Sequence, residues 1–359
     1  MILFNNPLNC QEDNNRSINA FIKENIEDNF EHYGLANFYN SINVFVLQND
    51  TLIKIDSTPF TINQEDKLII SGRYKALVIK DEIKTVSFSK KNISFNSSYS
   101  IPENLNGNIF IKSNLNPSDG ALYGLKYSHL WYPLKVLSNF FERIFVNLDK
   151  NYIKNSGISI IFMALIFKLL LLPNSIMLNR SQQRVSNIKK QIEPLLKKIK
   201  TSNKSSEDKH NAIMKVYKDT KLSPFFEIKP LFYSILPIPF LIAIFNVLGE
   251  SYQLYGQSFL WIDNLSYPDN YKKLSFEIPL MGNYLNLLPV IMLILSLLLS
   301  YVHNDSRSDV TSLKKQKINL SLVGILFALL FYPFPSALVM FWIFMNIFDS
   351  IFLRIIRND

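Results

Sequence analysis

The chain has 359 residues, of which 48% are hydrophobic, and its formal net charge is +9. It contains one cysteine, Cys10, which excludes an intrachain disulfide and a cysteine-based zinc site, and its four histidines lack the spacing of metal ligands. It has neither a Walker loop nor a GxGxxG motif, so we expect no catalytic centre, no metal, no cofactor and no small-molecule substrate.

Charged and apolar residues divide the chain into two parts. Residues 1–120 carry 11 Lys plus Arg against 14 Asp plus Glu, so the positive charge lies in the remainder. There the basic residues fall between long apolar runs, where the positive-inside rule places them in a membrane protein. The basicity therefore indicates membrane topology before it indicates a nucleic-acid ligand.

Short β-branched and aromatic runs, separated by turn residues, characterise residues 42–111. The runs are INVFVL, TLIKI, KLIIS, KALVIK, TVSFS and NIFIK. Their spacing of about 8 to 12 residues is typical of a small sandwich or part of one. We predict a mainly-β extramembrane domain over residues 1–120.

An amphipathic helix is predicted within residues 121–155. Apolar side chains such as Leu130, Leu134 and Phe141 recur every three or four residues, with Lys135 and Arg143 between them. Such a helix is too interrupted to cross a membrane, and an aromatic, basic helix directly before a span usually lies along the bilayer interface. The alternative is that it docks on the β domain.

The segment Gly157–Leu178 is long and apolar enough to cross a bilayer, and it carries one charge, Lys168. A lysine inside a span is costly, so we expect it to face other helices or water and to be functional. The alternative is a lysine that extends toward the cytoplasmic interface, with Pro173 ending the helix. Because the first residues resemble no signal peptide, either this span acts as the signal anchor or an N-terminal piece is missing.

A basic helical hairpin is predicted over residues 179–229, which hold 13 Lys plus Arg and 5 Asp plus Glu. The positive-inside rule places it in the cytoplasm. It could simply be solvated, but clustered lysines also attract acidic lipid headgroups and ribosomal RNA. The docking residues that we predict are Lys189, Lys190, Lys197 and Lys198.

Four further apolar runs follow the hairpin, which predicts an α-helical polytopic membrane protein with a five-span core over residues 156–359. The runs are Leu231–Leu248, Tyr284–Val302, Ile318–Tyr332 and Ser336–Leu353. Pro237 and Pro239 are expected to bend the second span. The basic residues of segment 303–317 place the C-terminus in the cytoplasm and the β domain outside.

Three stretches resemble the YidC/Oxa/Alb family of membrane protein insertases. They are FPSALVMFWIFMN at 334–346, FLWIDNLSYPD at 259–269 and LSPFFEIKP at 222–230. The likeness extends over residues 130–359, in the family's order. It implies no enzyme activity; it implies that the chain inserts, folds and helps assemble integral membrane proteins through a hydrophilic groove open to cytoplasm and lipid.

The resemblance also assigns residues, partners and a location. Lys168 falls where the family carries a groove arginine, Ser234 is nearest to its glutamine, and the last span contributes Phe341, Trp342 and Asn346 to client binding. The expected partners are nascent membrane proteins and anionic lipids, with the ribosome and the Sec translocon as candidates. The expected location is the bacterial cytoplasmic (inner) membrane.

Several positions depart from the family pattern. Lysine is a point charge where the family has a planar guanidinium, and Ala164 replaces a polar residue one turn earlier. Phe341 and Trp342 lack the tyrosine hydroxyls of that aromatic pair. We therefore expect a less polar groove, and two alternatives stay open: a secondary transporter or channel, and a degenerate family member that acts as an assembly scaffold.

Overall fold

A computed structural model describes residue 26 and residues 32–56, 60–63, 66–79, 85–89, 92–96, 107–202, 205–219, 228–302 and 310–358. The chain forms two compact units. The first comprises residues 1–163 and 243–346, and the second comprises residues 164–242 and 347–359. Three helices continue from one unit into the other.

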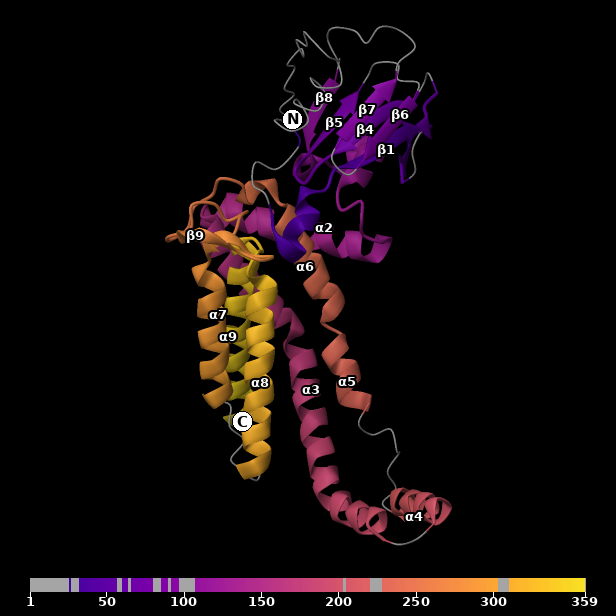
Figure 1. Ribbon diagram of the computed structural model, residues 1–359, viewed down its shortest axis with the longest axis vertical. Helices are drawn as coiled ribbons and strands as arrows, with labels where there is room; N and C mark the ends of the chain where they lie inside the picture. Colours follow the sequence, from indigo (N-terminus) through magenta and orange to yellow (C-terminus); the bar gives the residue numbers. More distant parts are fainter. Residues whose placement is uncertain are drawn as a thin grey trace. The chain divides into compact units, whose positions relative to one another are not determined.

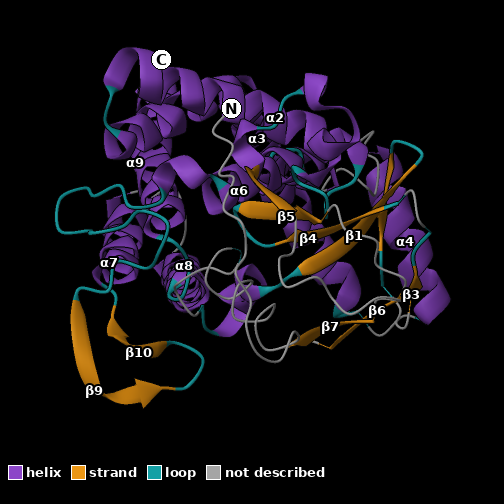
Figure 2. Ribbon diagram, turned by 90° about the horizontal axis from the view of Figure 1, so that it is seen from above, coloured by secondary structure: helices purple, strands orange, loops and turns teal. Residues whose placement is uncertain are grey.

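A five-stranded antiparallel sheet forms the N-terminal part of the first unit, with strand order β2-β1-β4-β5-β8 (Figures 1 and 2). Its strands are β1 (Asn43–Gln48), β2 (Thr51–Lys54), β4 (Lys67–Ser71), β5 (Lys75–Ile79) and β8 (Gly107–Ile111). These are five of the six runs predicted from the sequence. The mainly-β region expected there is confirmed, and its strands pair antiparallel.

Both faces of this sheet are buried, because its central strands are apolar at successive positions. Val44 and Ile70 lie opposite each other and belong to one core, whereas Phe45 and Ile69 form the next pair and belong to the other. Since successive side chains point to opposite faces, an uninterrupted apolar run supplies two cores.

The remaining strands form two smaller sheets. A three-stranded sheet contains β6 (Thr85–Ser89), which was predicted, between β3 (Phe60–Thr61) and β7 (Asn92–Asn96). A separate ribbon pairs β9 (Lys272–Ile278) with β10 (Gly282–Leu285). This ribbon was not predicted, since KKLSFEI carries three charged residues and lies between two apolar runs.

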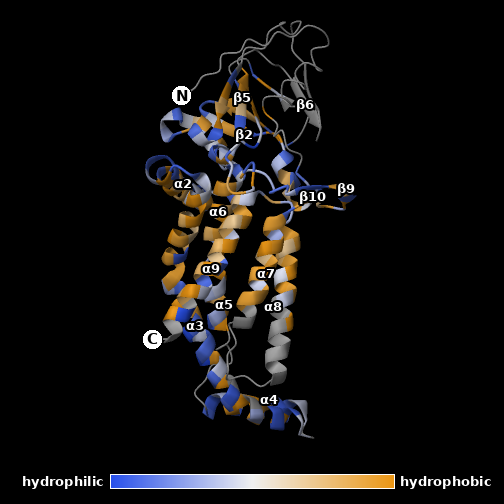
Figure 3. Ribbon diagram, turned by 90° about the vertical axis from the view of Figure 1, so that its left-hand side faces the viewer, coloured by the Kyte–Doolittle hydropathy of each residue, from blue (hydrophilic) through white to orange (hydrophobic). Residues whose placement is uncertain are grey.

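The helices of the first unit begin with α2 (Tyr132–Asn147), inside the segment predicted to be amphipathic. Helices α7 (Leu287–Val302), α8 (Val310–Phe331) and α9 (Ser336–Asn358) run alongside one another (Figures 1 and 3). Short helical turns complete this unit: η1 (Gly34–Asn40), η2 (Lys112–Asn114), η3 (Pro117–Leu125), the π-helical η4 (Leu148–Ile153) and η5 (Tyr252–Leu254).

The second unit is dominated by α3 (Ser156–Lys200), which begins in the first unit and continues without a break through Pro173 and Pro194. The alternative in which Pro173 ends this helix is wrong, since α3 continues to Lys200. The first arm of the basic hairpin is therefore a direct continuation of the first apolar helix. The second arm is α4 (Ser206–Asp219).

Prolines interrupt the next apolar run, as predicted. α5 (Ile228–Ile235) ends before Pro237, which has no backbone N–H to donate, and α6 (Ile238–Glu250) begins directly after it. Pro239 then lies in the first turn of α6, where a donor is not needed.

Two segments of the described chain are long and apolar enough to cross a membrane, by length and composition: Ser156–Ile192 and Ile228–Glu250. Three shorter apolar helices follow, Leu287–Leu299, Ser321–Phe331 and Ser336–Phe352. Figure 3 shows the predominantly hydrophobic colouring of α6, α7 and α9, and the more hydrophilic α4.

Candidate functional site

Lys168 is buried in the second unit, and its ammonium group has two partners. Nζ forms an ion pair with Asp349 Oδ1 and donates a hydrogen bond to Ser175 Oγ at 3.1 Å. The Ser175 hydroxyl in turn donates to the backbone oxygen of Leu171 at 3.2 Å. The charge that the sequence placed in an apolar helix is thus compensated by a carboxylate and fixed by a hydroxyl.

Asp349 is the residue of this site that sequence reasoning missed. It lies on α9, and like Lys168 it is a lone charge within an apolar stretch. At 1.5 Å per residue, Lys168 is about 18 Å from the start of α3 and Asp349 about 20 Å from the start of α9. The pair could have been predicted from the sequence, because the two lone charges have opposite signs and lie at similar distances along their helices.

The structure places Ser234 on α5, exposed, with its hydroxyl donating to the Leu231 backbone oxygen at 2.7 Å. Among the described residues, no bond joins Ser234 to Lys168. The contact between α3 and α5 is made instead by Asn174, whose side-chain amide donates to the Tyr233 backbone oxygen at 3.0 Å.

Phe341, Trp342 and Asn346 belong to the first unit. Phe341 is buried. Trp342 stacks on Phe327 and Phe331 of α8, with ring centres 5.3 and 5.4 Å apart. Trp342 thus contributes to the packing of α9 against α8, and Asn346 is partly exposed one turn before Asp349 on α9.

The predicted docking lysines of the hairpin lie on the last turns of α3. Lys190, Lys197 and Lys198 are exposed, and the side chain of Lys189 lies outside the described part of the structure. No group of three or more His, Cys, Asp or Glu side chains suited to a metal ion occurs among the described residues.

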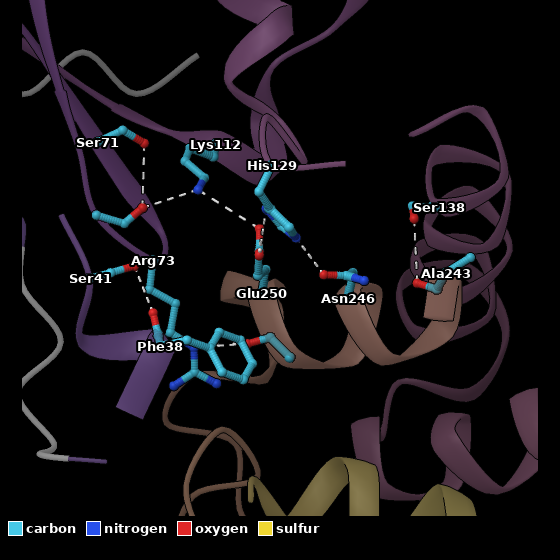
Figure 4. Close-up of polar contacts among 12 residues, drawn as sticks. Phe38, Ser41, Ser71, Arg73, Lys112, His129, Ser138, Ala243, Asn246 and Glu250 are labelled. Carbon is cyan, nitrogen blue, oxygen red and sulfur yellow. Dashed lines mark hydrogen bonds and ion pairs between the residues drawn. The ribbon is translucent and has the colours of Figure 1, made fainter. Parts of the chain in front are cut away.

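Arg73, in the turn between β4 and β5, forms the centre of a second buried cluster, in the first unit (Figure 4). Its guanidinium donates to the backbone oxygens of Gly249, at 2.8 Å, and Ser266, at 3.1 Å. It also lies 2.7 Å from His32 Nε2 and 4.1 Å from the centre of the Tyr39 ring. Because arginine can only donate, His32 accepts at Nε2 and is neutral here.

A chain of polar contacts continues from this cluster along the end of α6 (Figure 4). Lys112 Nζ lies 3.8 Å from Glu250 Oε2, and Glu250 Oε1 lies 3.5 Å from His129 Nδ1. His129 Nε2 is 2.7 Å from Asn246 Oδ1. Burial lowers the pKa of Lys112, and the opposing charge of Glu250 limits that shift.

The stretch 259–269 has a structural role at the start of α7. Asp269 Oδ2 accepts hydrogen bonds from the backbone N–H groups of Leu287, at 2.7 Å, and Leu288, at 3.0 Å, and from the Trp261 indole at 3.2 Å. It therefore caps the helix, which also favours its negative charge. Burial nevertheless raises the pKa of Asp269.

Residues 148–359 match the family model described as "60Kd inner membrane protein". This match covers more than half of the chain. The chain belongs to the YidC/Oxa/Alb family.

Relatives in this family are membrane protein insertases by name. The chain is 33% identical over 208 residues to the "Membrane protein insertase YidC" of Chlamydia trachomatis serovar D, covering 56% of this chain and 25% of the relative. The corresponding values are 34% over 193 residues, 52% and 24% for Chlamydia muridarum, and 28% over 199 residues, 55% and 32% for Chlorobium luteolum. The chain spans about a quarter to a third of the length of these relatives.

A solved structure, described as "Active YidC insertase crystal structure with the first transmembrane domain resolved", is similar at 16% identity. The alignment covers 86% of this chain and 82% of that chain, with a TM-score of 0.39.

In this family member, two of the three stretches that resemble the family bind each other. The backbone N–H of Ser336 donates to the Tyr267 oxygen at 2.7 Å, and that of Ala337 donates to the Leu265 oxygen at 3.0 Å. The Ser336 hydroxyl adds a bond of 2.7 Å to the same Tyr267 oxygen. The start of α9 is thereby joined to the loop that also caps α7.

Proposed function

We propose that this chain is a membrane protein insertase and chaperone of the bacterial cytoplasmic (inner) membrane. Five apolar helical segments cross the bilayer, with the β domain outside and the C-terminus and basic hairpin inside. The polar outer segment of a client enters a hydrophilic groove beside the first span while its apolar segment moves into lipid.

The observation that carries this proposal is the contact of the buried Lys168 with Asp349 and Ser175. Charged side chains inside apolar helices are costly, and they persist where they serve a polar pathway or binding site. This function requires no enzyme chemistry, because a polar group within the membrane lowers the cost of moving a short polar segment part-way across.

The client site that we propose comprises Lys168 with Ser234, Phe341, Trp342 and Asn346. Family membership and the matched segment 148–359 support it, since all five residues lie within that segment. Nascent membrane proteins are the proposed clients, the ribosome and anionic lipids are the proposed partners at the hairpin, and the Sec translocon is a further proposed partner.

The decisive experiment is complementation. The host's own insertase is depleted, this chain is expressed, and membrane insertion of a single-span client is measured by protease protection. We expect insertion to recover. A protein that reaches the membrane without restoring insertion would contradict the proposal, and solute flux in proteoliposomes would favour a transporter instead.

A second variant separates an insertase from an assembly scaffold. If the polar site acts on clients, Lys168→Ala lowers complementation severalfold. Full complementation by Lys168→Ala would favour the scaffold, because a scaffold does not depend on that charge.

A further inference from the structure

The two members of the Lys168–Asp349 pair differ in exposure. The Lys168 side chain is 6% exposed and that of Asp349 is 44% exposed. Lys168 also donates a hydrogen bond to the Ser175 hydroxyl, so its ammonium has two partners and is the less exposed member of the pair. A molecule that approaches this pair therefore meets the acid first.

No other charged side chain is available to offset the pair within the described apolar stretches. Lys168 is the only charge in Gly157–Leu178, and Asp349 is the only one in Ser336–Phe352. The other apolar stretches of the described helices, 231–248, 287–299 and 321–331, contain none. Within these stretches the two charges cancel, and the carboxylate is the more exposed of the two.

We propose that Asp349 sets the charge preference of the site, so that the chain accepts client segments that are uncharged and polar, or basic, and disfavours acidic ones. This inference rests on the proposed insertase function and names its substrate class. A lone lysine in this position would favour acidic segments by simple charge attraction, and its pairing with the more exposed Asp349 reverses that preference.

The reason lies in what each client group would do to the pair. An amide, hydroxyl or ammonium group can donate to the Asp349 carboxylate, which accepts several hydrogen bonds, while Lys168 keeps its own contact. An acidic group has no proton to donate and is repelled by the exposed carboxylate. To reach Lys168 it must displace Asp349, which then lies uncompensated in apolar surroundings.

The test uses the full-length protein in vesicles of phosphatidylethanolamine and phosphatidylglycerol. Three versions of one single-span client carry Asn, Asp or Lys at the same position of a short translocated tail, and insertion is measured by protease protection. For the wild-type protein we expect the Asn-tailed client to insert at least fivefold better than the Asp-tailed client, and the Lys-tailed client to resemble the Asn-tailed one.

Variants of the pair should change this ratio. Asp349→Asn is expected to bring the Asn-to-Asp ratio close to one, since the exposed negative charge is gone. The exchanged pair, Lys168→Asp with Asp349→Lys, keeps an ion pair and turns the positive end outward, so the Asp-tailed client should then be preferred. Asp263→Asn, in an exposed external loop, is the matched control and should keep the wild-type ratio.

Three results would overturn the inference. One is equal or better insertion of the Asp-tailed client by the wild-type protein, and another is an unchanged ratio in both Asp349→Asn and the exchanged pair. Failure of the wild-type protein to insert any client above protein-free vesicles would instead overturn the proposed function, and this inference with it.

Discussion

Lys168 and Asp349 are each unfavourable alone and tolerable together. Removing one partner of a buried ion pair leaves an uncompensated charge, whereas replacing both with apolar residues of similar size is often neutral. The partial exposure of Asp349 reduces this cost without removing it. The pair therefore allows stability to be separated from function by single and double substitution.

Lys168→Met is expected to lower the free energy of unfolding by about 1 to 3 kcal/mol, because Asp349 loses its partner in apolar surroundings. The double variant Lys168→Met/Asp349→Leu should recover that stability, yet insert clients poorly. Thermal unfolding in detergent and client insertion are measured side by side, with Lys168→Arg as the control that keeps the charge. Wild-type insertion by the double variant would contradict a role for the pair in client binding.

A second buried charge, Glu142 on α2, predicts a pH dependence. Its carboxylate lies 2.7 Å from Lys126 Nζ, but burial outweighs that ion pair and raises the pKa of Glu142 above its usual value of 4.5. The folded state then holds a proton that the unfolded chain has already released. Stability therefore falls as pH rises from about 4.5 through the folded-state pKa, and levels off above it.

In Glu142→Gln this dependence should disappear. Thermal unfolding followed by tryptophan fluorescence between pH 4 and pH 7 measures it, and the slope rather than the absolute stability is the readout. Glu277→Gln, exposed on β9, should keep the wild-type slope. A slope that survives in Glu142→Gln would assign the dependence to another group.

For single residues, the sequence predicted features that one position reveals by itself, and it missed contacts whose partner lies far away along the chain. Lys168 was conspicuous because one charge interrupts an apolar run. Asp349 lies 181 residues further along, so its contact depends on tertiary structure. Arg73 was also missed, since nothing in SGRYKALVIK indicates that its side chain reaches Gly249 and Ser266.

For helices and strands, hydrophobic periodicity and prolines indicated which elements form, but they were less informative about where the elements end. The runs in the N-terminal part became strands because β-branched and aromatic residues fit a sheet buried on both faces. The break before α6 followed from Pro237, yet Pro173 failed to end α3. A proline ends a helix only where nothing else holds the chain helical, and that information is absent from the local sequence.

α2 presents two different apolar faces, which predicts contact with lipid. Leu134, Phe141 and Phe145 are buried within their own unit. On the other side Tyr132, Val136 and Phe140, spaced four residues apart, are exposed. Aromatic side chains on an exposed helical face are typical of the membrane interface.

The fluorescence of Trp131, which directly precedes α2 and is 68% exposed, tests this prediction. In a Trp261→Phe/Trp342→Phe variant it is the only tryptophan. In vesicles its emission should shift to shorter wavelength and be quenched by lipids brominated near the headgroup. Quenching by aqueous iodide alone would show that this face lies in water.

The end of α3 predicts salt-dependent docking at the hairpin. Replacing Lys189, Lys190, Lys197 and Lys198 with glutamine should weaken co-sedimentation with ribosomes and with phosphatidylglycerol vesicles. For an RNA partner, the slope of log affinity against log salt falls by about 0.7 to 0.9 per lost phosphate contact. For vesicles the loss is about 1 kcal/mol per lysine.

The control for the hairpin is Lys272→Gln/Lys273→Gln on β9, outside the hairpin. Co-sedimentation of this variant should equal that of the wild-type protein. Identical salt curves for the hairpin variant and the wild-type protein would leave the hairpin lysines with a solvating role only.

For the first unit as a whole, Arg73 joins the sheet to the helices. One side chain from the β4–β5 turn binds the end of α6, at Gly249, and the 259–269 stretch, at Ser266. Gly249 allows this approach, because a Cβ there would collide with the Tyr39 ring that packs on the guanidinium. The Arg73 guanidinium thus joins the sheet to the loop whose Asp269 caps α7.

Arg73→Lys should loosen this connection, although it keeps the charge. An ammonium cannot reproduce two divergent hydrogen bonds and the stacking on Tyr39, so we expect a loss of about 1.5 to 3 kcal/mol. Hydrogen exchange followed by mass spectrometry should show faster exchange in β4 and β5, whereas α8 stays protected, because the sheet can open without unfolding the apolar helices. Lys54→Arg, on the exposed β2, should leave exchange unchanged. If Arg73→Lys exchanges like the wild-type protein in β4 and β5, the link is held by the surrounding aromatic packing rather than by the guanidinium, and the sheet and helices would be coupled without it.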